Sequence, residues 1–492
     1  MADVLLAHSY FLRFDPKAFR QMQPYAPLGT LYAASYVRDQ GYDTAFFDAM
    51  LAESEREIEP LIIKHKPRIV VFFEDNFNYL SKMCLSRMRE ACFRMAAIAR
   101  KHGCTVIVQG SDPGDHLQQY FSNGIDHVIC GEGEITLKEL LDNLTAKPDA
   151  MPLEKIHGIA YHKNNEIVRT PKRALLGDLD SLPFPAWDLI DVEKYRAAWK
   201  QKHGYFSMNI ATTRGCPFRC NWCAKPVYGQ VYNSRSPANV VAEQKFLKER
   251  YGAEHIWFAD DIFGLKPGWV AEYEQQVIKE GARLPFKIQS RVDLLLQEDT
   301  IAHLAGAGCA EVWVGAESGS QKILDAMDKG TTVSQIDEAT RLLKKHGIRV
   351  AFFLQYGYTG ETVEDIKLTL EMVRRLEPDE IGLSVSYPLP GTEFYRRVES
   401  ALGRKKNWET SGDLDMMFPG TYSPAFYRAL HAATHKEFRL RQSLRSWVGG
   451  SNGDDKKIRH RFLLPWYAAS LFWYQRKMKK ERRASAPQAI PG

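Results

Sequence analysis

Long apolar runs are missing from this sequence, and so is the pattern of a secretory leader. The first residues lack a basic stretch followed by an apolar core, and no window reaches the roughly 18 apolar residues that a spanning helix needs. We therefore expect a cytoplasmic protein. With 492 residues, 45% of them hydrophobic, the chain can bury more than one core, and we expect about three domains.

Cysteine is also scarce, with eight residues in the whole chain. Five of them are scattered singly, at positions 84, 92, 104, 130 and 309. Such usage excludes the disulfide framework of a small secreted domain. The other three, Cys216, Cys220 and Cys223, lie within eight consecutive positions, and composition does not explain this cluster.

An excess of positive charge is absent from most of the chain. The segment 456–483 holds ten Lys or Arg and one acidic residue, a local net charge of +9 against +6 for the whole chain. The other residues therefore carry −3 in total. A body with this charge lacks the basic surface of a nucleic-acid-binding protein, and we expect no nucleic-acid partner.

Residues 1–150 alternate between short apolar runs and helical patterns. The apolar runs are at 3–8, 44–47, 69–73, 105–108 and 128–130. This alternation predicts a doubly wound, Rossmann-like parallel sheet, whose ligands bind beyond the carboxyl ends of the strands. The residues at three of those ends are small or polar, as a large polar cofactor requires: Glu74, Asp75 and Asn76; Gln109, Gly110, Ser111 and Asp112; Gly131, Glu132, Gly133 and Glu134.

The rest of the chain divides into three further parts. Residues 151–200 are interpreted as a linker with a hairpin that turns on Asn164 and Asn165. Residues 201–400 contain six expected strands, at 208–211, 256–259, 286–290, 311–315, 350–354 and 381–386. Six successive βα units predict a partial (β/α)6 barrel of the TIM type, with its chemistry at the carboxyl ends of the strands. Residues 401–492 are expected to form a helical C-terminal region.

The three cysteines directly follow the first strand of this predicted barrel. A structural zinc site needs four ligands, and no second Cys or His pair follows at finger spacing. A redox pair uses Cys220 and Cys223 but leaves Cys216 without a role. Three thiolates on one loop also suit a four-iron cluster and leave one iron open to a small molecule.

The segment CPFRCNWC resembles the CxxxCxxC loop of the radical S-adenosylmethionine (SAM) superfamily. The resemblance implies that Cys216, Cys220 and Cys223 bind a [4Fe-4S] cluster. It also implies SAM contacts in the cysteine loop and after the second, third and fourth barrel strands, at Phe218, Trp222, Asp260, Asp261, Arg291, Glu317 and Ser318. The family's fifth-strand loop usually has proline where this chain has Thr359.

A doubly wound domain before such a barrel resembles the cobalamin-binding domain of the B12-dependent branch. The segments PLGTLYAASYVRDQGYDTAFFDA and VICGEGEITLKELL carry this likeness. It implies cobalamin contacts at Pro27, Leu28, Gly29, Glu74, Asn76, Phe77, Gln109, Gly110, Ser111, Asp112, Gly131, Glu132, Gly133 and Glu134. No Asp-x-His-x-x-Gly motif occurs, so the lower cobalt ligand is undefined. Two alternatives are a scaffold domain without cofactor and a methylthiotransferase, whose resemblance would require clustered N-terminal cysteines.

The resemblance implies a cobalamin-dependent radical SAM enzyme. Such an enzyme cleaves SAM at its cluster to a 5′-deoxyadenosyl radical, and here it is expected to methylate an unactivated carbon. One alternative is an oxidative cyclase, as in the anaerobic magnesium-protoporphyrin monomethyl ester cyclases, acting on a porphyrin-like or lipid substrate. Another is a non-catalytic iron-sulfur and cobalamin sensor. The expected partners are a small hydrophobic substrate and an electron donor such as a flavodoxin or ferredoxin.

The basic C-terminal segment contains FLLPWYAASLFWY, thirteen residues from Phe462 to Tyr474. This run is too short to span a bilayer, but Trp and Tyr between basic flanks suit an interfacial helix on anionic lipid. Peripheral contact with the inner membrane face through residues 456–483 is one expectation. A helix docked on the barrel is the alternative.

Overall fold

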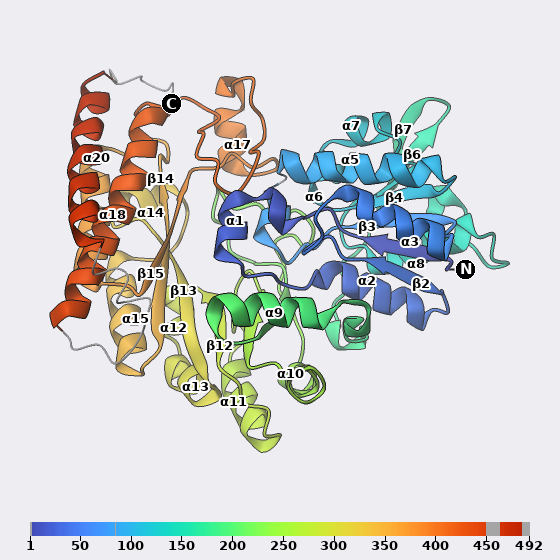
Figure 1. Ribbon diagram of the computed structural model, residues 1–492, viewed down its shortest axis with the longest axis horizontal. Coiled ribbons are helices and arrows are strands. Elements are labelled where there is room, and N and C mark those ends of the chain that lie inside the picture. Colours follow the sequence, from blue (N-terminus) through green and yellow to red (C-terminus); the bar gives the residue numbers. More distant parts are fainter. Residues whose placement is uncertain (1, 84, 449–462, 485–492) are drawn as a thin grey trace.

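The computed structural model contains two parallel sheets that lie side by side and a layer of C-terminal helices (Figure 1). The structure describes residues 2–83, 85–448 and 463–484. Residues 449–462, which include the start of the predicted interfacial segment, lie outside this range.

The N-terminal sheet is doubly wound, as predicted. Its strand order is β2-β1-β3-β4-β5-β6-β7, and β1 to β5 are parallel. These five strands are β1 (Val4–Ala7), β2 (Thr44–Phe47), β3 (Ile69–Phe73), β4 (Thr105–Gln109) and β5 (His127–Ile129). Strands buried on both faces are continuous apolar runs, which is why their positions could be predicted closely.

Helices cover both faces of this sheet. Successive strand residues face opposite sides, so Val70 and Phe72 belong to one core and Ile69 and Val71 to another. The first core includes residues of α3 (Ile58–His65) and α5 (Ser86–Lys101), and the second includes residues of α2 (Leu28–Asp39) and α8 (Glu134–Leu144). Shorter helices are α1 (Pro16–Gln21), α4 (Tyr79–Lys82), α6 (Ser111–Asp115) and α7 (Leu117–Ser122).

The predicted hairpin is present, but it extends the first sheet. Strands β6 (Ile159–Lys163) and β7 (Glu166–Arg169) pair antiparallel, and β6 pairs antiparallel with β5. The turn residues Asn164 and Asn165 have φ of 51° and 64°. Asparagine tolerates this left-handed region better than most residues. Residues 159–169 are therefore part of the N-terminal sheet.

The second sheet is the partial barrel. All six strands are parallel, in the order β15-β14-β13-β12-β11-β8. They are β8 (Ser207–Ile210), β11 (His255–Phe258), β12 (Phe286–Ser290), β13 (Cys309–Glu317), β14 (Arg349–Tyr356) and β15 (Glu380–Val385). A separate short ribbon pairs β9 (Thr213–Arg214) with β10 (Asn233–Ser234).

Helices follow the barrel strands and form its outer layer (Figure 1). They are α10 (Pro237–Tyr251), α11 (Trp269–Lys279), α12 (Val292–Leu295), α13 (Thr300–Ala307), α14 (Gln321–Ala326), α15 (Val333–Lys345), α16 (Val363–Leu376) and α17 (Glu393–Val398). Helix α9 (Val192–His203) precedes β8. Helices α18 (Pro424–Val448) and α20 (Leu464–Ala484) pack against each other, and α18 also contacts β15.

Among the described residues, no helix is both long enough and apolar enough to cross a bilayer.

Candidate functional site

The cysteine loop starts where β8 ends. The β9–β10 ribbon closes its base, because Arg214 pairs with Asn233 and Thr213 with Ser234. Gly215 has φ of 81°, and a Cβ there would lie 2.4 Å from the carbonyl oxygen of Val231. Only glycine fits this position, since any side chain would be both strained and crowded. The ribbon and this glycine position the segment that carries the three cysteines.

The thiols of Cys216, Cys220 and Cys223 are free and partly buried. Burial raises the pKa of Cys216, and it raises the pKa of Cys223 to about 12, although nearby Lys225 opposes both shifts. Thiolates at such positions need a strong positive partner, and a bound metal supplies one. The indole N–H of Trp222 is buried and has no hydrogen-bond partner among the described residues. This donor set fits an iron-sulfur cluster.

A mononuclear metal site was the other metal interpretation of these thiols. Among the described residues, no group of three His, Cys, Asp or Glu side chains is arranged to hold a metal ion. This result concerns side chains that would share a single metal ion. It does not bear on a [4Fe-4S] cluster, whose cysteine ligands bind different iron atoms.

Two cations lie close to Cys220. The guanidinium of Arg291 is 3.7 Å from the Cys220 Sγ and 3.7 Å from the centre of the Phe218 ring. Lys329 is buried, and its pKa is nevertheless raised, because the neighbouring Glu317 and Cys220 outweigh the opposing effect of burial. The sequence analysis identified Arg291 but missed Lys329, which follows β13 by twelve residues and has no motif of its own.

Glu317 ends β13 in a strained conformation. Its φ is 56°, it lies at a register shift between β13 and β14, and its carboxylate accepts a 2.9 Å bond from Lys329. Ser318 is fully buried, and its hydroxyl contacts Thr369 at 3.1 Å. The structure thus places Glu317 beside the cations near Cys220, whereas the hydroxyl of Ser318 is used within the protein. SAM contacts of both residues stay predictions.

Asp260 and Asp261 follow β11 and have different surroundings. The buried carboxylate of Asp260 accepts bonds of 2.7 and 2.8 Å from the amides of Thr212 and Thr213. Burial raises its pKa to about 6, and these hydrogen bonds limit the rise. Asp260 therefore ties the end of β8 to the end of β11, just before the cysteine loop. Asp261 forms an ion pair with Lys82 of α4, the short helix that follows β3 of the N-terminal sheet.

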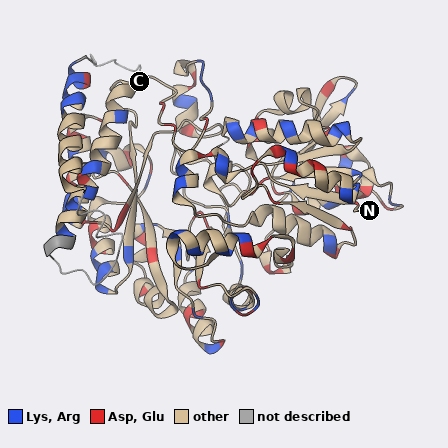
Figure 2. Cartoon of the chain, viewed as in Figure 1, with Lys and Arg blue, Asp and Glu red and all other residues tan. Residues whose placement is uncertain are grey.

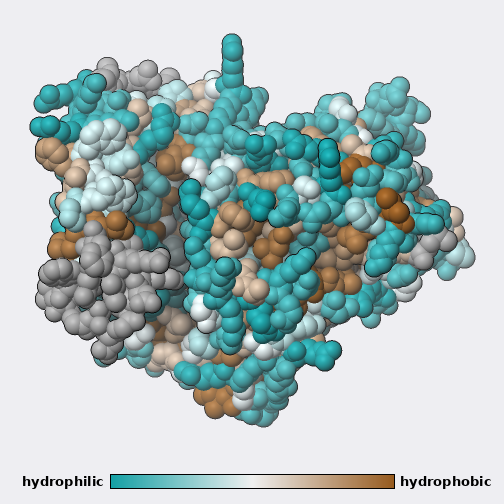
Figure 3. All heavy atoms as spheres, in the orientation of Figure 1, coloured by the Kyte–Doolittle hydropathy of each residue, from teal (hydrophilic) through white to brown (hydrophobic). Residues whose placement is uncertain are grey.

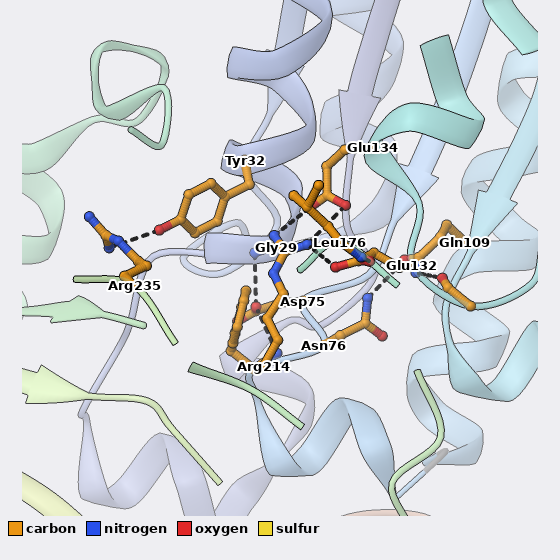
Figure 4. Close-up of polar contacts among 12 residues, drawn as sticks. Gly29, Tyr32, Asp75, Asn76, Gln109, Glu132, Glu134, Leu176, Arg214 and Arg235 are labelled. Carbon is orange, nitrogen blue, oxygen red and sulfur yellow. Dashed lines mark hydrogen bonds and ion pairs between the residues drawn. The ribbon is translucent and has the colours of Figure 1, made fainter. Parts of the chain in front are cut away.

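The strand-end carboxylates of the N-terminal sheet contact the barrel. Arg214 pairs with Glu132 at 2.5 Å and with Glu134 at 2.6 Å, and all three side chains are buried (Figure 4). Burial raises the pKa of Glu132, and the charge of Arg214 is the largest effect that acts to lower it. Sequence reasoning assigned both carboxylates to cobalamin. It missed Arg214, which stands two residues before Cys216.

Other predicted cobalamin residues form a hydrogen-bonded network at the same sheet edge (Figure 4). Asn76 donates to the side chain of Gln109 at 2.9 Å, and Gln109 donates to the carbonyl of Gly131 at 2.8 Å. Glu74 is buried, its pKa is raised to about 7 by burial, and it accepts from Ser9. Asp112 is bound by Arg89 and Tyr120.

The remaining predicted positions support the same edge by packing. The amide of Gly29 donates to Asp75 at 3.0 Å (Figure 4). Leu28 and Phe77 belong to the core shared with the barrel, and Pro27 precedes α2. Gly110 and Gly133 lie against the side chains of Glu74 and Phe73, and Ser111 donates to the carbonyl of Ser81. Their contacts with cobalamin stay predictions.

The carboxyl ends of the two sheets face each other. The contacts of Arg214 with Glu132 and Glu134, and of Lys82 with Asp261, join these ends directly. Tyr79 lies between the carboxyl ends of the two sheets, and its side chain is 46% exposed. Its pKa is raised by burial and, to a smaller extent, by the neighbouring Tyr387, Cys223 and Glu317. These neighbours place Tyr79 beside Cys223 and Glu317 at the carboxyl end of the barrel. The nearby buried hydroxyl of Ser81 has no hydrogen-bond partner among the described residues, as a site for a polar ligand requires.

Comparison with known families identifies the barrel. Residues 210–373, which start at the end of β8, match the model of the radical SAM superfamily. The chain contains a radical SAM domain. The matched residues include all three cysteines, Asp260, Arg291, Glu317 and Lys329.

Two known proteins resemble this chain over about three quarters of its length. An uncharacterized methyltransferase of Pyrococcus horikoshii is 29% identical over 396 residues, which is 79% of this chain and 82% of that protein. The anaerobic magnesium-protoporphyrin IX monomethyl ester cyclase of Rubrivivax gelatinosus is 27% identical over 76% of this chain and 66% of its own length.

A solved structure also matches the fold of nearly the whole chain. The cobalamin-dependent S-adenosylmethionine radical enzyme OxsB, determined with aqua-cobalamin bound, covers 96% of this chain with a TM-score of 0.74. The chain covers 72% of OxsB at 17% sequence identity. This likeness confirms the predicted fold: a doubly wound domain, a radical SAM barrel and a helical C-terminal region.

Proposed function

We propose that this protein is a cobalamin-dependent radical SAM enzyme that methylates an unactivated carbon. The observation that carries the proposal is the placement of the cysteine loop. It lies at the carboxyl end of the radical SAM barrel and directly faces the carboxyl end of a doubly wound sheet. Ligands of both folds bind at these ends, so two bound cofactors would meet in one internal space.

The residues present suit the cofactors that such an enzyme needs. Cys216, Cys220 and Cys223 would hold the cluster, and Arg291, Glu317 and Lys329, which lie near Cys220, would contact SAM. The strand ends at residues 74–79, 109–112 and 131–134 would border cobalamin. When bound, the reduced cluster cleaves SAM to a 5′-deoxyadenosyl radical, and cobalamin carries the methyl group.

Ion pairs between the chain's own residues fasten the two sheets together around this space. The buried pairs of Arg214 with Glu132 and Glu134 fasten one side, and the pair of Lys82 with Asp261 fastens another. Asp260 holds the start of the cysteine loop through the amides of Thr212 and Thr213. An external reductant, such as a flavodoxin or ferredoxin, would supply electrons.

The test is anaerobic reconstitution of the full chain with iron, sulfide and cobalamin, followed by SAM and a reductant. Formation of 5′-deoxyadenosine together with cobalamin-dependent S-adenosylhomocysteine supports methyl transfer. 5′-Deoxyadenosine alone favours an oxidative cyclase, the alternative that the likeness to the R. gelatinosus cyclase supports. Stoichiometric cobalamin binding without SAM cleavage, also with candidate substrates present, favours a sensor.

Alanine variants test the cluster ligands separately. Cys216→Ala, Cys220→Ala or Cys223→Ala is expected to lose the cluster and all SAM cleavage. Cys130→Ala is the matched control, because Cys130 is also free and partly buried but follows β5. Retained 5′-deoxyadenosine formation in any of the three variants contradicts the assignment.

We also propose that the outer face of α20 contacts an anionic membrane surface. Tyr467 of α20 is buried against α18, whereas Trp466, Phe472 and Trp473 are each more than half exposed. Figure 3 shows hydrophobic residues on this side of the molecule, and Figure 2 shows Lys and Arg at the end of the helix. Residues 476–483 hold six Lys or Arg and one Glu. Aromatic side chains beside such charge suit an anionic lipid interface.

Vesicle flotation tests this contact. The wild-type chain is expected to float with vesicles of phosphatidylglycerol and phosphatidylcholine but not with phosphatidylcholine alone. Serine at positions 466, 472 and 473 together should abolish flotation, whereas Ile278→Ser, at an exposed residue of α11, should not. Equal flotation of all variants refutes the proposal. Self-association of the wild type that the triple substitution removes assigns the face to a second copy instead.

A further inference from the structure

The inner face of the barrel sheet borders a space that solvent reaches. On the outer face, Ile288 and Val314 are buried in the core that includes the surrounding helices. On the inner face, Gln289, Trp313 and Phe353 are partly exposed, although they stand in central strands. A sheet that is covered on both faces buries both sets of side chains. The barrel interior is therefore not filled by its own side chains.

The strand register places one row of residues across the lower part of this inner face. Trp257 on β11 aligns with Asn209 on β8 and with Lys287 on β12, and Lys287 aligns with Glu311 on β13. Asn209 is held by two bonds to the backbone of Ala26, of 3.0 and 2.8 Å. Residues of the N-terminal domain therefore close this end of the interior.

Lys287 is a cation without an anionic partner in this row. Its Nζ lies 3.4 Å from the centre of the Trp257 ring, and no carboxylate of the described residues forms an ion pair with it. Glu311 is turned to other groups, since it accepts from the indole of Trp313 at 2.8 Å and pairs with Arg349 at 3.5 Å. Burial lowers the pKa of Lys287 to about 8, and the charge of Glu311 offsets only part of this shift. A half-buried cation in this situation is stabilised by a bound anion.

Aromatic rings line the interior above Lys287. The rings of Trp313 and Phe353 lie 4.6 Å apart with an interplanar angle of 32°. A Cβ at Gly382 would lie 3.0 Å from the Trp313 ring, so glycine leaves room for both rings. Such a wall suits the apolar body of a ligand.

The distance along β12 sets the length of that body. Arg291, which lies beside Cys220, follows Lys287 by four positions. At roughly 3.3 Å a residue, this separation is about 13 Å. A molecule whose anionic end contacts Lys287 would extend past the rings and reach the cysteine end of the barrel.

We propose that the barrel interior binds the substrate as a hydrophobic carboxylate, with its anionic group on Lys287 and its apolar body on Trp313 and Phe353. A monoanion fits better than a phosphate dianion, because Glu311 stands next to Lys287 in the same row. This assignment rests on the proposed function, since it takes the interior as the substrate side of the radical site.

Fluorescence titration with two probes tests the site. 1-Pyrenebutyrate carries the carboxylate, and 1-pyrenebutanol is its uncharged counterpart of similar size. The full-length protein is expected to bind the carboxylate at least about tenfold more tightly than the alcohol, a difference of about 1.4 kcal/mol. Lys287→Met should remove this preference and leave binding of the alcohol unchanged, whereas Lys287→Arg should keep it.

Controls make each outcome decisive. Lys279→Met, at an exposed lysine of α11, should behave as the wild type. If Lys287→Met does not fold, Lys287→Gln replaces it. Equal affinity of the wild type for both probes, or an unchanged preference without the lysine charge, overturns the assignment. The titration needs neither cluster nor SAM, so a preserved preference without SAM cleavage would contradict the proposed function and not this site.

Discussion

Replacement of Arg214 by methionine tests whether its buried ion pairs hold the two sheets together. The Arg214, Glu132 and Glu134 side chains are 4%, 7% and 4% exposed, so the variant leaves two carboxylates buried without their cation. Breaking a buried pair costs about 3–5 kcal/mol. A domain of 150–250 residues loses about 2–4 °C of Tm per kcal/mol, which predicts a fall of roughly 6–20 °C.

Differential scanning fluorimetry measures this fall in Tm, and the size of the fall should depend on pH. Burial raises the pKa of Glu132 in the folded protein, and the variant removes the cation that opposes this. A carboxyl with a raised folded pKa binds its proton more tightly when folded, so its stabilisation is lost as pH rises. The deficit of the variant should therefore grow between pH 5 and pH 8.

Two further variants separate this effect from general damage. Arg38→Met removes an ion pair with Asp188 whose side chains are 40% and 58% exposed, and it should change Tm very little. Glutamine at both 132 and 134 in the Arg214→Met background should recover part of the loss, because it removes the buried charges. A Tm of Arg214→Met close to the wild type at pH 8 would refute the reasoning.

Two predictions concern the loop and the cations near it. Gly215→Ala should lower the iron content after reconstitution far more than Gly229→Ala. Both positions have positive φ, but only at Gly215 would the added Cβ lie 2.4 Å from a backbone oxygen. Equal iron contents in the two variants would contradict this prediction. Lys329→Met should keep the cluster but slow SAM cleavage at least about tenfold, because Glu317 then lacks the cation that it contacts at 2.9 Å. Formation of 5′-deoxyadenosine at the wild-type rate would contradict this prediction.

The sequence predicts this fold well where structure is local. Buried parallel strands such as Ile69–Phe73 are uninterrupted apolar runs, and the Asn164-Asn165 turn depends only on its own backbone preference. The three cysteines were likewise recognisable from spacing on one short loop. Each of these features is determined by residues that are close together in the chain.

Partners distant in the chain could not be predicted. Arg214 meets Glu132 and Glu134 across about 80 positions, so the sequence shows acidic strand ends without the cation that occupies them. Lys329, the partner of Glu317, has no motif that marks it in the sequence, and only the structure identifies this pair. The inward direction of Lys287 follows from strand register, which no local motif reveals.

The use of Glu132 and Glu134 for docking changes what the doubly wound sheet contributes. Polar strand ends suggest groups that bind a cofactor directly, but here Glu132 and Glu134 bind Arg214 of the barrel. Arg214 is also two residues from Cys216, so the contact that joins the sheets positions the cysteine loop as well. A change at the sheet interface should therefore reach Cys216, which is only two residues away. The sheets and the loop are therefore one mechanical unit, and iron content should fall together with Tm in Arg214→Met but not in Arg38→Met.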